Sequence, residues 1–498
     1  MLVPRPARVS PVPLARLASG RGSLDGPDVP VTGVTATSGA VRPGDLFAGL
    51  AGRTAHGATF AAAAVAAGAV AVLTDAAGRA LVPAGVPVLV VPDVRAVLGP
   101  VSAEVYGNPA AAMRMLGVTG TSGKTTTGFF LRAGLHAAGR VPGLIGTVAT
   151  MIGDDEIKTG FTTPEAPDVQ ALLAVMRERG VTDVAMEVSS HALAMHRVDG
   201  IRFDVGAFTN LSEDHLDFHA DMEDYFAAKA QLFDRVERAV VVVDDAWGVR
   251  LTEQLDGPLA TVTAVGERRA TWEAVEIEDR PDGSTAFRAL GPGVEVAMGS
   301  AVPGRYNVAN ALLAVAMLHE VGVPVEVSAP AIATAAVPGR MERIDAGQPY
   351  LAIVDYSHKP AAVDGALRAL RPLTRGRLII VLGCGGDRDR GKRPHMGAIA
   401  ARGADLLVIT DDNPRSEDPA AIRRAMLDGA LAVPAAERGE VVEVGDRRAA
   451  IEHAVEVAHG GDTVLVAGKG HETGQEVAGV VHPFDDRIAL RKAIEASK

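Results

Sequence analysis

A short run of glycine, hydroxyl and lysine residues is the part of this sequence whose chemistry is easiest to interpret. Residues 113–118 are mostly apolar, and Gly-Thr-Ser-Gly-Lys-Thr-Thr follows at positions 120–126. Glycines let the backbone turn tightly enough for several N–H groups to face one anion, and a following helix adds the positive end of its dipole. Lys124 can neutralise nucleotide phosphates, and Thr125 can offer its hydroxyl to Mg²⁺. The run predicts a nucleoside triphosphate site.

This run departs from the strict phosphate-loop pattern at one position. That pattern has a glycine six places before Lys124, where this sequence has Val118. An ordinary strand–turn–helix connection is the alternative, but a Gly-Lys-Thr-Thr run between a strand and a helix favours phosphate binding. The predicted ATP contacts are Gly120, Thr121, Ser122, Gly123, Lys124, Thr125 and Thr126.

Polar clusters also follow other strand-like segments. Glu187 ends one such segment, and His215 and His219 follow another. Ligands of open parallel sheets bind beyond the carboxyl ends of the strands, so we expect these side chains to share an edge with the phosphate loop. Thr125, Glu187 and His215 are the predicted Mg²⁺ ligands. The two histidines could instead bind zinc, although the glutamate typical of such a pair is missing.

Strand-like and helical segments alternate along most of the chain, which is typical of a parallel sheet covered by helices. A first series predicts strands at 115–118, 183–187, 205–209 and 239–243, and helices at 125–138, 167–178, 222–236 and 307–318. A second series predicts strands at 352–355, 378–382, 406–410, 441–444 and 463–467. Residues 273–298 suggest an antiparallel insertion. Turn-rich breaks at 106–109 and 336–340 predict domains 1–108, 109–337 and 338–498.

Composition limits the class of protein. The 498 residues carry a formal net charge of −12, which argues against nucleic-acid binding. Cys384 is the only cysteine, so a reducing compartment, the cytoplasm, is expected, and we interpret this residue as structural. The longest apolar run, 60–73, is too short to span a bilayer and predicts a helix–strand pair. We find no targeting or membrane segment.

Several motifs occur together here in the order found in a known family. They are Gly120-Thr-Ser-Gly-Lys-Thr-Thr126, Glu187-Val-Ser-Ser-His191, Asn210 with His215, Lys229, Asn307-Val-Ala-Asn310, Gly339-Arg-Met-Glu342 and Asp355-Tyr-Ser-His-Lys-Pro360. With them the chain resembles, over nearly its whole length, the ATP-dependent Mur ligases of bacterial cell-wall synthesis.

The resemblance implies an α/β fold with three domains. Residues 1–108 would bind a UDP-muramoyl substrate, 109–337 would form a P-loop ATPase-type parallel sheet with helices on both faces, and 338–498 would form a Rossmann-like domain that binds the added amino acid. In the implied reaction a substrate carboxylate attacks the γ-phosphate of ATP, and an incoming amine displaces phosphate from the acyl phosphate. Such chemistry needs positioned charges and no covalent protein nucleophile. A monomer is expected.

The run Asp412-Asn-Pro-Arg415 resembles the signature of the members that add meso-2,6-diaminopimelate to UDP-N-acetylmuramoyl-L-alanyl-D-glutamate. Arg415 and Arg388 can hold the distal carboxylate, because arginine forms two parallel hydrogen bonds, and Glu472 can receive the distal ammonium. The alternatives are a sister ligase that adds L-lysine, D-Ala-D-Ala or, on folate, glutamate, and a non-catalytic nucleotide-binding regulator.

The resemblance also assigns further residues by position. Lys229 matches a carbamylated lysine, which would join the Mg²⁺ ligands and the catalytic set of Lys124, Glu187 and His215. Asn307, Asn310, Arg340 and Asp355 match positions near ATP. Ser38, Arg53, Thr54 and Ala55 match the uridine and sugar site, and Thr162, Thr163, Ser189, Met195 and Arg197 match the peptide site. The amino-acid site would contain Arg388, Asp412, Asn413, Pro414, Arg415, Gly468 and Glu472.

Overall fold

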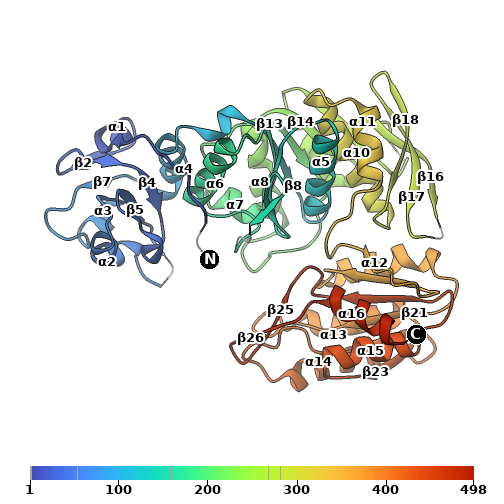
Figure 1. Cartoon of the computed structure of the whole chain (residues 1–498). Helices are drawn as coiled ribbons and strands as arrows, with labels where there is room; N and C mark the ends of the chain where they lie inside the picture. The colour runs from blue at the N-terminus through green and yellow to red at the C-terminus, as the bar shows by residue number, and fades with distance from the viewer. Residues whose placement is uncertain (1–2, 53, 158–159, 267, 281, 498) are drawn as a thin grey trace. The chain divides into compact units, whose positions relative to one another are not determined.

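The computed structural model describes residues 3–52, 54–157, 160–266, 268–280 and 282–497. The chain forms two compact units (Figure 1). The first contains Met1–Glu273, Leu290–Val296 and Ala309–Ile332, and the second contains Ala274–Ala289, Ala297–Val308 and Ala333–Lys498.

The N-terminal part of the first unit is a small α/β sheet with strand order β2-β7-β6-β5-β4. Strand β5 is buried along its whole length because helices cover both faces: Leu46 and Ala48 pack with α4, and Phe47 packs with α2. The helix–strand pair predicted over 60–73 is confirmed by α2 and β6. The elements are β1 (Val12–Pro13), α1 (Leu14–Ala18), β2 (Ser23–Asp25), β3 (Pro30–Val31), β4 (Gly33–Thr35), η1 (Ser38–Ala40), β5 (Asp45–Gly49), η2 (Gly57–Phe60), α2 (Ala61–Ala66), β6 (Ala71–Thr74), α3 (Ala76–Arg79), β7 (Val88–Val90) and α4 (Val94–Val105).

The central sheet has strand order β11-β10-β9-β12-β8-β13-β14-β15-β16-β17-β18, and β9 to β16 of this order run parallel. Helices α6, α7 and α8 supply the core on one face, while α5 packs on the other beside α10. Its elements are η3 (Pro109–Ala112), β8 (Arg114–Thr119), α5 (Lys124–Ala137), β9 (Pro142–Ile145), β10 (Thr150–Ile152), β11 (Asp155–Ile157), α6 (Ala166–Glu178), β12 (Asp183–Glu187), α7 (Ser190–Ala194), β13 (Phe203–Phe208), α8 (Met222–Ala230), η4 (Gln231–Arg235), β14 (Val236–Val242), α9 (Ala246–Thr252), β15 (Leu259–Thr263), β16 (Trp272–Asp279), β17 (Thr285–Gly291), β18 (Val294–Ser300), α10 (Arg305–Glu320) and α11 (Val325–Ala333).

Strand register brings the polar ends of three central strands to one edge. In the parallel pairs, Glu187 of β12 lies opposite Val118 of β8, and Phe208 of β13 lies opposite Thr119. The segments that follow these strands therefore leave the sheet side by side. This arrangement places the phosphate loop next to Glu187 and Asn210, as the sequence predicts.

The second unit contains a sheet of order β19-β20-β24-β21-β22-β23, parallel from β20 to β23. Strand β21 is fully buried because α15 and α16 cover one face while α12, α13 and α14 form the other layer. Its elements are β19 (Glu342–Arg343), β20 (Leu351–Asp355), α12 (Pro360–Leu370), η5 (Arg371–Leu373), β21 (Leu378–Leu382), α13 (Lys392–Gly403), β22 (Leu406–Ile409), α14 (Pro419–Leu431), β23 (Glu440–Glu443), α15 (Arg447–Glu456), β24 (Thr463–Ala467), β25 (Gly474–Val477), β26 (Val480–Pro483) and α16 (Asp486–Ala496).

The predicted α/β architecture is confirmed. The main difference concerns the helix predicted over 222–236, since the α-helix ends at Ala230 and tightens into the 3₁₀ turn η4 before β14 begins at Val236. The predicted insertion at 273–298 forms consecutive strands, β16 to β18, at the edge of the sheet. The boundaries at 108/109 and 337/338 stay predictions. Across the part of the chain that the structure describes, no helix combines the length and apolarity needed to cross a membrane.

Candidate active site

The predicted phosphate loop connects β8 to α5 in the first unit. Gly120 and Gly123 have φ angles of 141° and 91°, which L side chains rarely adopt. A Cβ atom on Gly120 would lie 1.8 Å from Thr209 Oγ1, and one on Gly123 would lie 2.4 Å from Asn310 Oδ1. Both positions therefore require glycine, and the predicted ATP residue Asn310 lies against the loop.

Two lysine amines meet at one carbonyl of this loop. Lys124 Nζ donates to the carbonyl oxygens of Gly120 at 2.7 Å and Thr121 at 3.0 Å. Lys229, on α8, is only 1% exposed, and its Nζ donates to the Gly120 oxygen at 2.8 Å and lies 4.5 Å from the centroid of the Tyr225 ring. The structure thus brings the two predicted catalytic lysines together at the phosphate loop.

Glu187 is buried at the end of β12 and connects this strand to the phosphate loop. Its Oε2 accepts hydrogen bonds from Thr125 Oγ1 and Thr147 Oγ1, both at 3.0 Å, and its Oε1 accepts from the Thr147 backbone N–H at 2.9 Å. Thr147 Oγ1 also lies 2.9 Å from Thr162 Oγ1, which connects the carboxylate to the predicted peptide site. Glu187 therefore positions the loop hydroxyl that the sequence assigns to Mg²⁺.

The predicted Mg²⁺ ligands are joined only in part. Thr125 and Glu187 are in direct contact, whereas His215 lies against His191, with ring centroids 4.7 Å apart, and the amine of Lys229 bonds the loop. Among the described residues, no group of three or more His, Cys, Asp or Glu side chains could hold a metal ion. Two oxygen donors beside a phosphate loop still fit Mg²⁺, which keeps several waters and takes further oxygens from substrate phosphates.

The zinc alternative for His215 and His219 is not supported. His219 is buried, its Nε2 lies 3.0 Å from Ser190 Oγ, and its Nδ1 lies 3.2 Å from Asp224 Oδ2. Both ring nitrogens therefore have protein partners. Burial, together with the neighbouring His219, lowers the pKa of His191, so this ring is neutral near pH 7.

The predicted peptide-site residues gather beyond Glu187. Thr163 Oγ1 donates to the Glu187 carbonyl oxygen at 2.8 Å and accepts from the Ser189 backbone N–H at 3.2 Å. Arg197 donates to the Thr163 carbonyl oxygen at 3.1 Å and forms an ion pair with Glu165 at 2.7 Å. Arg197 also lies close to the thioether of Met195 and over the exposed ring of Phe161.

The predicted uridine-site residues are less connected. Ser38 begins η1, whereas Thr54 and Ala55 lie in the loop between Ala51 and His56, which form a β-bridge. Arg53 lies outside the described residues. No hydrogen bond within the described ranges joins Ser38 to Thr54 or Ala55, and their assignment to the uridine and sugar site stays a prediction.

In the second unit, Asp355 ends β20 and organises the turn after it. Its Oδ2 accepts from the Met341 backbone N–H at 2.7 Å, and its Oδ1 accepts from the Ser357 N–H at 2.8 Å. The neighbouring Arg340 stacks over the Tyr356 ring, 4.3 Å from its centroid. Arg340 and Asp355 therefore belong to one cluster. Asn307, at the start of α10, donates to the Pro303 carbonyl oxygen at 2.7 Å.

A second polar cluster in this unit joins the ends of β22 and β24. Asn413 Nδ2 donates to Glu472 Oε2 at 2.9 Å, and the buried Lys469 donates to both side chains. Gly468 has φ 115°, and a Cβ atom there would lie 2.7 Å from Asp412 Oδ2. The structure thus brings together four of the residues predicted to bind the amino acid.

Arg415 is held by a neighbouring hairpin. Its backbone N–H donates to the Glu476 carbonyl oxygen at 3.0 Å, and its φ is 52°. The guanidinium donates to the Gly386 carbonyl oxygen at 2.6 Å, with its Nε 3.3 Å from Glu476 Oε2. Asp418, three residues further on, is the N-cap of α14 and accepts from the Ala420 backbone N–H. Pro414 precedes Arg415, and Arg388 is exposed on the loop after β21.

Two polar contacts were not predicted from the sequence. Thr147 donates a hydrogen bond to Glu187, 40 positions further along the chain, and Lys469 donates one to Asn413, 56 positions before it. Lys469 stands within the Gly-Lys-Gly-His-Glu run after β24, and a lysine between two glycines in a polar turn is the one signal that could have indicated it. The single cysteine is buried, and burial raises the pKa of the Cys384 thiol to about 12, which fits the structural role predicted for it.

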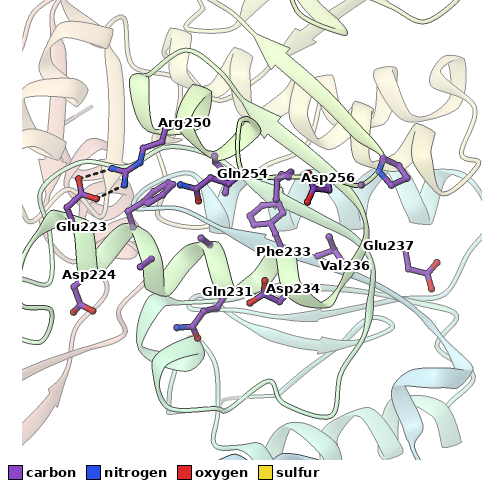
Figure 2. A pocket seen from close by; sticks show the side chains of 18 of the residues that line it. Glu223, Asp224, Gln231, Phe233, Asp234, Val236, Glu237, Arg250, Gln254 and Asp256 are labelled. Carbon is purple, nitrogen blue, oxygen red and sulfur yellow. Dashed lines mark hydrogen bonds and ion pairs between the residues drawn. The ribbon is translucent and has the colours of Figure 1, made fainter.

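A separate cavity of about 840 Å³ lies against α8, η4, β14, α9 and the loop that precedes β15. Figure 2 shows its Glu223–Arg250 ion pair, whose atoms approach to 2.6 Å. None of its lining residues is a predicted site residue. The candidate active site is therefore the polar edge of the sheet and not this cavity.

Comparisons with known proteins agree with the motifs. Family descriptions match residues 30–106 (Mur ligase family, catalytic domain), 118–318 (Mur ligase middle domain) and 339–470 (Mur ligase, glutamate ligase domain). Relatives from Streptomyces avermitilis and Streptomyces coelicolor, each named UDP-N-acetylmuramoyl-L-alanyl-D-glutamate–2,6-diaminopimelate ligase, are 55% and 54% identical over 99% of both chains. A solved structure of the same name is 32% identical with a TM-score of 0.68, covering 94% of this chain and 95% of that one. Together with the phosphate loop and the two polar clusters, these matches show that the chain belongs to the Mur ligase family.

Proposed function

We propose that this chain is an ATP-dependent ligase that adds 2,6-diaminopimelate to UDP-N-acetylmuramoyl-L-alanyl-D-glutamate in peptidoglycan precursor synthesis. The full-length relatives at 54–55% identity carry that name. The structural observation behind the amino-acid assignment is the hydrogen bond between Asn413 and Glu472, which lies close to Arg415 in the same cluster of loops. The meso stereoisomer, a monomeric state and a cytoplasmic location are further parts of the proposal.

The phosphate loop explains how the carboxylate is activated. The backbone N–H groups at the N-terminus of α5 and the amine of Lys124 would bind the β/γ-phosphates, as in such loops. The N–H groups of Thr121 and Ser122 instead donate to Asn210 and hold the loop in shape. As charge moves onto the β-phosphate of the departing ADP, a fixed cation stabilises the transition state more than the ground state. Lys124 then exchanges its bonds with the loop carbonyls for bonds with the nucleotide.

Thr125 and Glu187 would hold Mg²⁺, which supplies charge neutralisation on the phosphates when bound. Glu187 also keeps the Thr125 hydroxyl oriented, because the two are hydrogen-bonded at 3.0 Å. We include His215 and a carbamylated Lys229 as candidate ligands. The burial of Lys229 beside the phosphate loop supports the second assignment, because a carbamate formed there would face the predicted Mg²⁺ site.

The amino-acid site explains selectivity. Diaminopimelate differs from lysine by a distal carboxylate, and arginine is the side chain best suited to bind it. Lysine lacks this carboxylate and would leave the arginine of the site without its anionic partner, so lysine should bind poorly. Glu472 accepts the distal ammonium. The sister ligases would require another group at Arg415.

A panel of amino acids tests this proposal. Release of ADP is measured with ATP, the UDP-muramoyl dipeptide and, in turn, meso-diaminopimelate, LL-diaminopimelate, L-lysine, D-Ala-D-Ala or L-glutamate. We expect turnover with meso-diaminopimelate and only background ADP release with the other amino acids. Equal turnover with L-lysine would contradict the substrate assignment. ATP binding without product for every amino acid would favour the alternative of a non-catalytic nucleotide-binding regulator.

A further inference from the structure

The lysine after Gly468 is unusual because its charged group is buried. The Lys469 side chain is 0% exposed, and its Nζ lies 2.9 Å from both Asn413 Oδ1 and Glu472 Oε2. A buried ammonium is costly unless it is paired with a charge and hydrogen-bonded. Both conditions are met here, by two residues predicted to contact the amino acid.

These contacts fix the orientation of the Asn413 amide. Its Oδ1 accepts from Lys469 and from the Glu476 backbone N–H at 3.0 Å, so its Nδ2 must face Glu472, which it reaches at 2.9 Å. A flipped amide would set its NH₂ group against two donors. Lys469, Asn413 and Glu472 therefore form a closed triangle of hydrogen bonds.

The triangle also orients the Glu472 carboxylate. Among the described residues, the two side-chain hydrogen bonds to this carboxylate both go to Oε2 and leave Oε1 unused. The Glu472 side chain is 33% exposed while that of Lys469 is fully buried, so the cation stands behind the carboxylate. One oxygen is thus anchored in the protein and the other is oriented for a ligand.

We propose that Lys469 is a positioning residue for the incoming amino acid: it holds Glu472 and Asn413 in the orientation that receives the distal ammonium. This inference rests on the proposed function of the site. Lys469 acts through these two side chains, and its loss should weaken binding of the amino acid more than binding of ATP or of the UDP-muramoyl dipeptide.

The test replaces Lys469 with Met, which keeps most of the volume and removes the charge. We expect the KM for diaminopimelate to rise about tenfold or more, as for a lost hydrogen-bonded charge, while the KM values for ATP and the dipeptide change by less than about twofold. Lys469→Arg keeps the charge and should recover part of the loss. Lys492→Met, at an exposed lysine of α16, is the matched control.

A double-mutant cycle separates positioning from a merely structural role. If Lys469 acts through Glu472, the effects of Lys469→Met and Glu472→Gln on the diaminopimelate KM should be far from additive. Additive effects, an equal rise in all three KM values, or no rescue by Lys469→Arg in a folded protein would overturn the inference. Should wild-type enzyme use another amino acid, the proposed function fails, and the same cycle with that amino acid still tests Lys469.

Discussion

The amines of Lys124 and Lys229 both donate to the carbonyl oxygen of Gly120, at 2.7 and 2.8 Å. One lysine comes from the first turn of α5 and the other from α8, so the loop is held by two different helices. The convergence of two amines on one acceptor fixes the Gly120 carbonyl and holds both predicted catalytic lysines at the phosphate loop.

Replacing Lys124 with Met should lower kcat by about 10²–10³-fold, the loss typical for a donor that stabilises developing charge. The KM for diaminopimelate should stay unchanged because that site lies on other strands. Steady-state ADP release measures both constants. Wild-type kcat in this variant would remove Lys124 from the mechanism.

Lys229→Met should also abolish most of the activity, and it tests carbamylation directly. We expect intact-protein mass spectra recorded in bicarbonate buffer to show a CO₂ adduct in the wild type and none in the variant. An adduct that persists in the variant, or full activity of CO₂-depleted wild type, would contradict this role.

Glu187→Gln keeps the size of the side chain and removes its charge. The variant should need about tenfold or more Mg²⁺ for half-maximal rate, since a carboxylate ligand would be lost and Thr125 would be held less firmly. The measurement is a Mg²⁺ titration after treatment with EDTA. An unchanged Mg²⁺ requirement would place the metal elsewhere.

Arg415→Ala should raise the diaminopimelate KM by about 10–100-fold, because a charge-assisted pair is lost. The low rate with L-lysine should change much less, so the ratio of the rates with diaminopimelate and L-lysine should fall. Arg424→Ala, at an exposed arginine of α14, is the control. A parallel fall in both rates would indicate that Arg415 only supports the fold.

Stability should depend on pH through His358. Burial lowers its pKa from 6.5 to about 4, so the unfolded chain binds more protons between these values. The contribution is complete above pH 6.5 and is lost as the pH falls toward 4, with about 2 kcal/mol lost by pH 5. Urea unfolding at pH 7 and pH 5 should therefore show a smaller decrease in His358→Asn than in the wild type. Equal decreases would exclude His358 as a source.

Much of the fold could be predicted because its strands are continuous apolar runs. Leu378–Leu382 is such a run, and β21 has those bounds. The phosphate loop was equally clear, since its residues are contiguous. Thr147 and Lys469 were missed because their importance depends on partners far along the chain, which only the folded sheet brings near. The turn of His215 toward His191 likewise depends on packing, with φ 55° at His215.

The hairpin of β25 and β26 has a further consequence. It bonds the backbone of Arg415 on both sides, through the Glu476 carbonyl and the Ala478 N–H. Insertions or deletions in this hairpin should therefore shift Arg415 and change which amino acid the enzyme accepts, even when the Asp-Asn-Pro-Arg run itself is unchanged.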